Sequence, residues 1–600
     1  MMRVLVRIFA ALGFLTVLLF AGAIGVLIVF GPKKPELPQD IVLEFDFEQP
    51  LTEAEPDSPL AGILTPEAVT IRQVVEALDR AGRDPRVKGF IAKVGNPSQG
   101  IAETQELRDA VDRFRRTGRF ALVHAETFGE FQNGMQSYYL AAGFEQIWMQ
   151  PMGHVGITGL LSERPFYREA LDKLRIVPQI GRRHEYKSAA EPYMERETTP
   201  ASKEMMESLI DDLFSQMVES IAANRGLTVE AVNAAIDRAP LLDREALEMK
   251  LVDRLGYWDE LVDTAKRLAV PAAGDREEPR EAGLVPLLDY RHAAGPADDT
   301  GSAVALIVGE GAIERGESRI DPLSGTSSFG ADDVAEALED AIDNPAIKAI
   351  LFRVNSPGGS AVGSERVRRQ ILRARAAGKP VLISMGNLAA SGGYWVSMSA
   401  DRIVALPGTL TGSIGVLGGK MVTSGLTDWL GIHHDSTARG GHAGIWSNQT
   451  PYTASELARR DALLDDIYAH FTQAVADGRK LPLETVRTIA RGRVYTGRQA
   501  RNVGLVDALG GYATALAEIR QLLKLEVDAP VRLVPFPQPK TAVERFAALL
   551  GGAAHVELGR QLLADALAEY RPLLARIAPA LKADTESAIL LMPPLGIAGY

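Results

Sequence analysis

The sequence carries one pattern twice, as DPRVKGFIAKV at residues 84–94 and as NPAIKAILFRV at residues 344–354, offset by 260 residues. In each copy a Pro-containing turn precedes an extended apolar run. A second turn follows the run, Asn96-Pro97-Ser98-Gln99-Gly100 in one copy and Asn355-Ser356-Pro357-Gly358-Gly359 in the other, and a charged helical stretch comes after it. A repeat at a fixed offset indicates an internal duplication.

The correspondence continues along both copies. RFALVHAE (119–126) matches PVLISM (380–385), SYYLAAGFEQIWM (137–149) matches YWVSMSADRIVAL (394–406), and LDREALEMKLVDRLG (242–256) matches YTGRQARNVGLVDALG (495–510). Short apolar strands alternate with amphipathic helices, a pattern typical of βαβ units with a largely parallel sheet. The sequence therefore predicts an α/β fold of two tandem units, each of about 200 residues.

The predicted units are residues 41–269 and 303–525. The Pro, Gly and charge content of 270–302 predicts a linker between them. Residues 526–600 have no counterpart in the first unit, and we expect a C-terminal extension that is mostly helical.

The N-terminal region, residues 1–40, contains an uncharged apolar stretch at 8–30. As a helix, 23 residues would reach about 34 Å, enough to cross a membrane. The run is too long for a typical cleavable signal peptide, so we expect an uncleaved anchor. The charges on its two sides are nearly balanced and favour a cytoplasmic N-terminus only weakly.

Composition excludes several classes of function. A chain of 600 residues exceeds one core, and 46% hydrophobic with 24% charged residues is ordinary globular composition. The net charge of −12, without a basic stripe, argues against nucleic-acid binding. The sequence contains 0 cysteines, which excludes disulfide scaffolds, thiolate metal sites and cysteine nucleophiles.

The two copies differ at one strand-to-helix turn. In the second copy Ser391 lies among small residues in Ala389-Ala390-Ser391-Gly392-Gly393, where a hydroxyl would be exposed beside the N–H groups of a helix N-terminus. Aligned through Tyr138 and Tyr394, the first copy has Met135 instead. Its counterpart of the Pro357-Gly358-Gly359 turn is Pro97-Ser98-Gln99. Joint loss of the serine and the glycine turn indicates that both belong to one site.

Acyl transfer is the chemistry that needs both features. A serine attacks a carbonyl carbon, and two aimed backbone donors stabilise the oxyanion, each worth about 2.7–4 kcal/mol. Glycine lets the backbone approach closely. We assign the donors to the N–H groups of Gly359 and Gly392, with Gly358 as a neighbouring candidate.

Three motifs give the chain a family resemblance: Asn355–Gly359, Ser384–Tyr394 and Leu410–Gly415. In this order they resemble the signal peptide peptidase A family, and the duplication and N-terminal anchor resemble its long form. The resemblance covers roughly residues 5–520. It implies ClpP/crotonase-like units and a serine–lysine dyad, with the serine taken from the second unit and the lysine from the first.

Carried onto this chain, the resemblance makes Ser391 the nucleophile and Lys187 the general base. Lys187 stands in Tyr186-Lys187-Ser188-Ala189, followed by Glu191-Pro192, as in the family pattern. The corresponding stretch of the second unit, Ala438–His442, lacks that segment. A lysine can accept a proton only when it is neutral, so burial must lower its pKa toward the working pH. Ser413 is the hydroxyl that the resemblance implies for orienting the amine.

The resemblance also implies the setting. It predicts a membrane-anchored homotetramer in the bacterial inner membrane, with its catalytic body facing the periplasm, acting on cleaved signal peptides and other extended apolar peptides. Whether Ser391 meets Lys187 of its own chain or of a neighbour stays open at this point.

Other chemistries compete with a dyad. A Ser-His-Asp triad would need one of nine histidines, of which His433-His434-Asp435 is the most suggestive set, while His184 could line the cleft of Lys187. Adjacent histidines usually point apart and no third ligand spacing follows, so we expect no metal. The chain has no Walker-type phosphate loop, and we expect no cofactor. A crotonase-type coenzyme A enzyme, which would need no serine at 391, and a non-catalytic scaffold remain alternatives.

Overall fold

The computed structural model describes residues 37–54, 69–95, 99–270, 281–295, 301–319, 328–538 and 589–591. The predicted transmembrane stretch, 8–30, lies outside these residues, as does most of the C-terminal extension. Within the part of the chain that the structure describes, no helix has both the length and the apolar character needed to cross a membrane.

The first unit is built on a parallel sheet with the strand order β10-β6-β5-β4-β1-β11. Its strands are β1 (Ile41–Asp46), β4 (Val87–Lys93), β5 (Phe120–Ala125), β6 (Gln146–Met149), β10 (Arg254–Leu255) and β11 (Gly283–Pro286). The first copy of the repeated pattern forms β4 in the middle of this sheet. Its nearly continuous apolar run is what a parallel strand covered on both faces requires.

The second unit repeats this order as β22-β18-β17-β15-β12-β23, again with parallel neighbours. Its strands are β12 (Ser302–Glu310), β15 (Ala349–Ser356), β17 (Val381–Ala390), β18 (Arg402–Ala405), β22 (Ala508–Leu509) and β23 (Val531–Phe536). Two strands extend the sheet beyond β17, namely β19 (Leu410–Gly412) and β21 (Val494–Thr496). The prediction of two tandem α/β units is confirmed.

A pair of tyrosines also marks the duplication. The hydroxyl of Tyr138 donates to the carbonyl of Leu251 at 2.7 Å, and that of Tyr394 donates to the carbonyl of Leu505 at 2.9 Å. Because these four residues occupy corresponding places in the two copies, the alignment through Tyr138 and Tyr394 holds in space.

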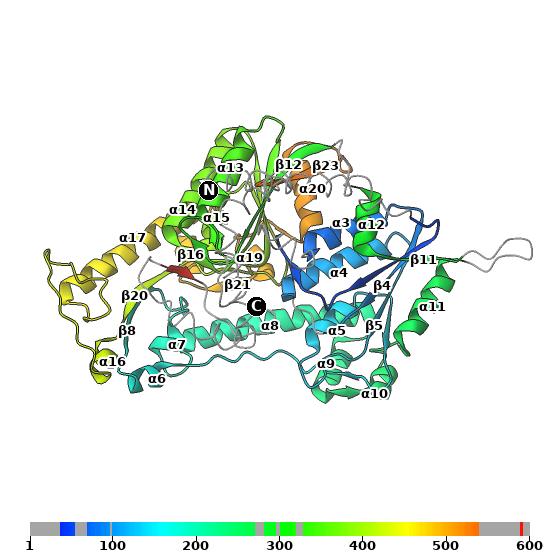
Figure 1. The fold of residues 1–600 in the computed structure, drawn as a ribbon, viewed down its shortest axis with the longest axis horizontal. Helices are drawn as coiled ribbons and strands as arrows, with labels where there is room; N and C mark the ends of the chain where they lie inside the picture. Colours follow the sequence, from blue (N-terminus) through cyan, green and yellow to red (C-terminus); the bar gives the residue numbers. More distant parts are fainter. Residues whose placement is uncertain are drawn as a thin grey trace, which may run out of the picture.

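Helices flank both sheets (Figure 1). Those of the first unit are α3 (Ile71–Ala81), α4 (Ile101–Arg115), α5 (Met135–Ala141), α9 (Val229–Arg238), α10 (Asp243–Glu248), α11 (Trp258–Ala269) and α12 (Leu287–Ala294). Those of the second are α13 (Ala331–Asp343), α14 (Ala361–Ala376), α15 (Gly392–Ser397), α16 (Ser424–Trp429), α17 (Ala454–Arg479), α18 (Leu483–Ile489), α19 (Gly497–Asn502) and α20 (Tyr512–Leu522). Short strands complete the described fold: β2 (Leu51–Thr52), β3 (Val69–Thr70), β7 (His154–Val155), β9 (Leu241–Leu242), β13 (Ile313–Glu314), β14 (Phe329–Gly330) and β16 (Gly358–Ser360).

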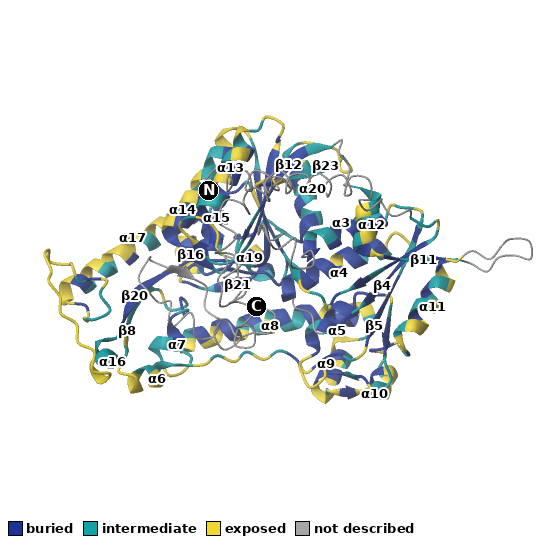
Figure 2. Ribbon diagram, in the orientation of Figure 1, coloured by how far each residue is buried: buried dark blue, intermediate teal, exposed yellow. Residues whose placement is uncertain are grey.

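The two units share a core, as the alternation along β15 shows. Ile350 and Phe352 pack in a cluster with the second unit's own helices, whereas Leu351, between them, packs in a cluster made mostly of first-unit residues. Because successive side chains of a strand point to opposite faces, one face of the second sheet lies against the first unit. Figure 2 shows the buried residues running through both sheets.

A third sheet contains strands from both units. Its order is β14-β13-β16-β24-β20-β8, in which β8 (Val177–Arg183) comes from the first unit and β20 (Val416–Val422) from the second. These two strands pair antiparallel over their full length. Helices α6 (Arg168–Lys173), α7 (Glu191–Met194) and α8 (Pro200–Arg225) belong to the same arm of the first unit, and α8 runs along the lower side of both units in Figure 1. The first unit therefore extends beneath the second.

The predicted linker, 270–302, needs correction. Strand β11 within it pairs with β1, and Leu287 and Tyr290 of α12 are fully buried. The segment was predicted to be a linker because residues rich in Pro, Gly and charge flank the apolar run Leu284-Val285-Pro286-Leu287-Leu288. Residues 283–294 therefore belong to the first unit.

The predicted C-terminal extension, 526–600, was expected to be mostly helical, but its described parts contain two strands. Strand β23 is the edge strand of the second sheet, in the place that β11 takes in the first. Strand β24 (Ile589–Leu591) pairs antiparallel with β16 and contacts β20. Residues 539–588, where we expected helices, lie outside the described part.

The assignment of α12 to the first unit predicts that Leu287→Ala destabilises the protein. Removing a fully buried leucine costs about 2–5 kcal/mol, which corresponds to about 2–4 °C of melting temperature per kcal/mol in a unit of this size. The exposed neighbour His292 is the control, since His292→Ala should change the free energy of unfolding by no more than about 0.5 kcal/mol. Equal melting temperatures for both variants, measured by circular dichroism, would restore the linker assignment.

Candidate active site

Ser391 occupies a strained turn between β17 and α15. Its backbone has φ 57° and ψ −111°, a left-handed region that non-glycine residues rarely adopt. The turn is fixed because the Ser391 N–H donates to the Gly412 carbonyl at 2.8 Å and the Ser391 carbonyl accepts from Trp395 N–H at 2.8 Å. Strain of this kind at a strand-to-helix turn is typical of a positioned nucleophile.

Lys187 follows β8 by four residues and is fully buried. Its Nζ lies 2.6 Å from Ser391 Oγ, 2.9 Å from the Ser413 carbonyl oxygen and 3.0 Å from Ser413 Oγ. A neutral amine has two N–H groups and one lone pair. Three contacts of this kind fit a lysine that donates to both Ser413 oxygens and accepts the proton of Ser391.

Burial lowers the pKa of Lys187 well below its ordinary value of 10.5. An ammonium that leaves water loses its hydration, and only a nearby negative charge could restore what is lost. Among the residues that the structure describes, no carboxylate forms an ion pair with Lys187. Burial therefore favours the neutral form of the amine, which is the form that can accept a proton.

The loop that carries Lys187 is held by the second unit. Tyr186 N–H donates to the Arg491 carbonyl at 3.2 Å, and Glu185 forms an ion pair with the Arg491 side chain. Further along the loop, the fully buried Glu191 accepts from Arg182 at 3.1 Å and from Thr199 Oγ1 at 2.6 Å. Lys187 is thus fixed from both sides, within the same chain as Ser391.

Gly392 and Gly359 lie next to each other beside Ser391. A Cβ on Gly392 would lie 3.0 Å from the Gly359 nitrogen and 3.1 Å from Gly358 Cα. Gly359 has φ 153°, and a Cβ there would collide with the backbone of Ile313 on β13. Gly392 is the first residue of α15, so its N–H has no acceptor within the helix. The Gly359 nitrogen and the start of α15 are therefore close together beside Ser391.

Gly358 does not fit the role of neighbouring donor. Its N–H donates to Ser356 Oγ at 3.2 Å, which leaves it less available to a ligand. The role of Ser356 was not predicted from the sequence, although a serine two residues before a backbone N–H in a turn is a common signal for such a side-chain-to-backbone bond.

The histidines considered for a triad lie elsewhere. The His184 ring packs edge-on against Tyr468 with ring centroids 4.7 Å apart, and His433 and His434 are exposed on the loop after α16. In the described part of the chain, the side chain that contacts Ser391 Oγ is Lys187. His555 lies outside that part.

Met135 takes the place of Ser391 in the first unit and is buried at the start of α5. Its thioether offers no nucleophile that a base could activate. The first unit therefore supplies the Lys187 amine, and the second unit supplies the Ser391 hydroxyl.

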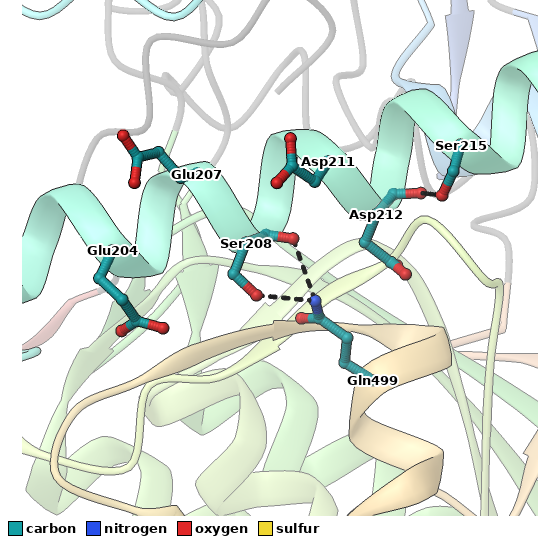
Figure 3. A pocket seen from close by; sticks show the side chains of 7 residues that line it. All are labelled: Glu204, Glu207, Ser208, Asp211, Asp212, Ser215 and Gln499. Atoms are coloured by element: carbon teal, nitrogen blue, oxygen red, sulfur yellow. Dashed lines mark hydrogen bonds between the residues drawn. The ribbon is translucent and has the colours of Figure 1, made fainter.

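A separate acidic pocket lies between the units, on α8 and α19. Figure 3 shows its lining residues: Glu204, Glu207, Ser208, Asp211, Asp212, Ser215 and Gln499. Gln499 Nε2 donates to the carbonyl and hydroxyl oxygens of Ser208, both at 3.1 Å. Arg493 pairs with Glu204 and Arg498 pairs with Asp212. These contacts join the two units, and the pocket includes none of the residues around Ser391.

Comparison with known proteins identifies a family and several relatives over most of the chain. The family model for peptidase family S49 matches residues 130–270 and 373–526, one region in each unit. The chain is similar to Protease 4 of Salmonella typhi, with 33% identity over 76% of this chain and 72% of the relative. Protease 4 of Haemophilus influenzae is 30% identical over 79% of this chain and 76% of its own length. The chloroplastic serine protease SPPA of Arabidopsis thaliana is 28% identical over 81% and 70%.

Among solved structures, a ClpP1 mutant from Listeria monocytogenes covers 35% of this chain and 94% of its own length, with 15% identity and a TM-score of 0.23.

The geometry predicts that reaction of Ser391 with a fluorophosphonate probe depends on neutral Lys187. Because the folded pKa lies below 10.5, the neutral fraction and the labelling rate should rise with pH through that lowered pKa and then level off. Ser413→Ala removes one hydrogen bond of the amine and should slow labelling about 3- to 12-fold.

Ser188→Ala is the matched control for Ser413→Ala. The Ser188 hydroxyl is buried next to Lys187 and, in the described structure, has no hydrogen-bond partner. Its removal should leave the labelling rate unchanged. Equal slowing by both substitutions would contradict the orienting role of Ser413.

Proposed function

This chain belongs to peptidase family S49 and is a serine peptidase, and from that premise we propose that Ser391 is its nucleophile and Lys187 its general base. The observation that carries the proposal is the 2.6 Å contact between Ser391 Oγ and the fully buried Lys187 amine, whose pKa burial lowers. No other titratable side chain contacts that hydroxyl in the described residues.

The reaction follows from the positions of these groups. Ser391 Oγ attacks the carbonyl carbon of a peptide bond while Lys187 Nζ takes the hydroxyl proton. The oxyanion accepts hydrogen bonds from the N–H groups of Gly359 and Gly392. Lys187 then gives its proton to the departing amine, leaving an acyl-enzyme. Lys187 then takes a proton from a water molecule, whose oxygen attacks the ester carbon. The bond from that carbon to Ser391 Oγ breaks, and Lys187 returns the proton to Oγ as the acid is released.

Ser413 supports each step by fixing the amine. With both N–H groups directed to Ser413 oxygens at 2.9 and 3.0 Å, the lone pair of neutral Lys187 is left to face Ser391. A freely rotating amine would spend part of its time with an N–H toward the hydroxyl. Ser413 is therefore a positioning residue for the base.

We further propose that the substrate binds as an added strand beside β16. The chain's own strand β24 pairs antiparallel with β16, with Gly359 opposite Leu590 and Gly358 opposite Leu591. This pairing supports a peptide-binding mode in which main-chain hydrogen bonds hold an extended segment next to the oxyanion donors. The sequence of β24, Ile-Leu-Leu, is apolar, as expected for peptides derived from signal sequences.

The biological setting is part of the same proposal. The apolar stretch 8–30 would anchor the chain in the bacterial inner membrane, and the catalytic body would face the periplasm. Anchoring keeps the enzyme at the surface where cleaved signal peptides are released. Assembly into a homotetramer would restrict access of folded proteins to Ser391.

Replacing either dyad residue should abolish peptide hydrolysis while preserving the fold. Lys187→Met should lower kcat by about 10²- to 10⁴-fold or more because the general base is lost, and Ser391→Ala should leave only background hydrolysis. Lys203→Met, at an exposed position on α8, is the control and should retain full activity. Substantial activity in Lys187→Met, measured with a fluorogenic apolar peptide, would refute the dyad.

Strand β24 should compete with peptide substrates for the position beside β16. Removal of residues 589–600 should therefore lower the apparent KM, by about tenfold if the position is free a tenth of the time. Removal of 592–600 alone leaves β24 in place and should keep the parent KM. Identical KM values for the two truncated proteins would exclude a shared binding position.

A further inference from the structure

The parallel pairing of β15 and β17 is irregular just before the active site. Pairing runs regularly from Ile350 opposite Val381 to Val354 opposite Met385, and then resumes at Ser356 opposite Ala389. Between these points β15 has one residue, Asn355, whereas β17 has three, Gly386, Asn387 and Leu388. Extra residues in one strand bend it and re-aim the side chains that follow.

The register after this bulge fixes the geometry of the site. Two residues beyond Ala389 comes Ser391, and three residues beyond Ser356 comes Gly359. A different register would move the hydroxyl away from the oxyanion donors. In the first unit the pairing of β4 with β5 ends at Lys93 opposite His124, before the point that corresponds to the bulge.

Asn355 holds the bulge. Its Oδ1 accepts from the Leu388 N–H at 3.0 Å, and its Nδ2 donates to Glu103 Oε1 at 3.3 Å. Glu103 belongs to the first turn of α4, in the first unit, and its backbone N–H donates to Asn387 Oδ1 at 3.1 Å. Two asparagines of the second unit therefore meet one glutamate of the first, on either side of the bulge.

The surroundings make these contacts hard to replace by water. Glu103 is 7% exposed and Asn387 8% exposed. The charged groups nearby are Glu53, Glu106 and Glu310, with Arg353 bound to Glu53 at 2.6 Å and to Glu106 at 2.7 Å. Burial and the Glu53 carboxylate raise the pKa of Glu103 to about 7. A neutral side chain at 103 is therefore compatible with the site.

We propose that Asn355 and Glu103 are positioning residues that lock the β17 bulge across the two units and so set Ser391 against Lys187 and the oxyanion donors. This inference rests on the proposed function, and it adds a reason for the covalent coupling of two units. The first unit supplies the base through β8 and, through α4, also fixes the strand that presents the nucleophile.

The test measures fluorophosphonate labelling of Ser391 together with peptide hydrolysis, in the full chain. The rate constant of labelling reports the geometry of the site, whereas its final extent reports how much protein is folded. Asn355→Ala should lower the labelling rate constant and kcat by about 10- to 100-fold, as expected for misplacement of reacting groups by about 1 Å. The final extent should match the parent's.

Three further variants separate positioning from general stability. Both oxygens of Glu103 accept hydrogen bonds, one from Asn355 and one from the Gly100 N–H at 2.8 Å. Glu103→Gln keeps one acceptor oxygen and should label faster than Glu103→Ala, which keeps none. The double variant Asn355→Ala/Glu103→Ala should be slowed by less than the product of the two single losses, because the two side chains share one contact. The inference would be overturned if Asn355→Ala labelled as fast as the parent. It would also be overturned if the rate losses of the single variants multiplied in the double variant, or if Glu103→Gln and Glu103→Ala lowered the labelling rate constant equally.

The two hypotheses fail in different ways. A parent protein that is labelled at Ser391 but cleaves no peptide would contradict the proposed function, and the labelling rates would still decide the role of Asn355. Peptide hydrolysis that is insensitive to Asn355→Ala would overturn the positioning role and leave the Ser391–Lys187 proposal standing.

Discussion

The structure depends on the burial of one lysine, to which none of the described carboxylates forms an ion pair. Lys187 is fully buried, its pKa is lowered by that burial, and its three polar contacts are oxygens of Ser391 and Ser413. An amine in this state costs folding free energy, because desolvation is not offset by an opposite charge. The rest of the fold has to hold it there, through the pairing of β8 with β20 and the loop contacts with Arg491.

Duplication explains how such a site can be built. Two sheets of the same strand order pack so that one face of the second lies on the first unit, and an arm of the first unit extends beneath the second. The copies then diverged at their strand ends. One has a serine and a glycine turn, and the other has Met135 in place of the serine. Neither copy alone contains both the amine and the alcohol.

Much of this architecture could be predicted from sequence because repeats and apolar runs are local signals. The patterns at 84–94 and 344–354 indicated the two units, and Ser391 with its glycines stood out by comparing the copies. Lys187 carried no such signal, since its burial is created by segments more than 200 residues away, Ser391 and Ser413; only the family resemblance indicated it. Strand β11 was missed because polar flanks surround it, and β24 because a strand of three residues has no pattern of its own. The anchor at 8–30 and the tetramer stay predictions.

The protonation state of Lys187 can be measured by an NMR titration of the full chain, with ¹³C at lysine Cε and Lys187→Met to assign the resonance. We expect the Lys187 signal to titrate well below the ordinary lysine pKa of 10.5, at pH values where the other lysines remain charged. A Lys187 resonance that titrates together with the surface lysines would show a charged amine beside Ser391 and would rule out Lys187 as the general base.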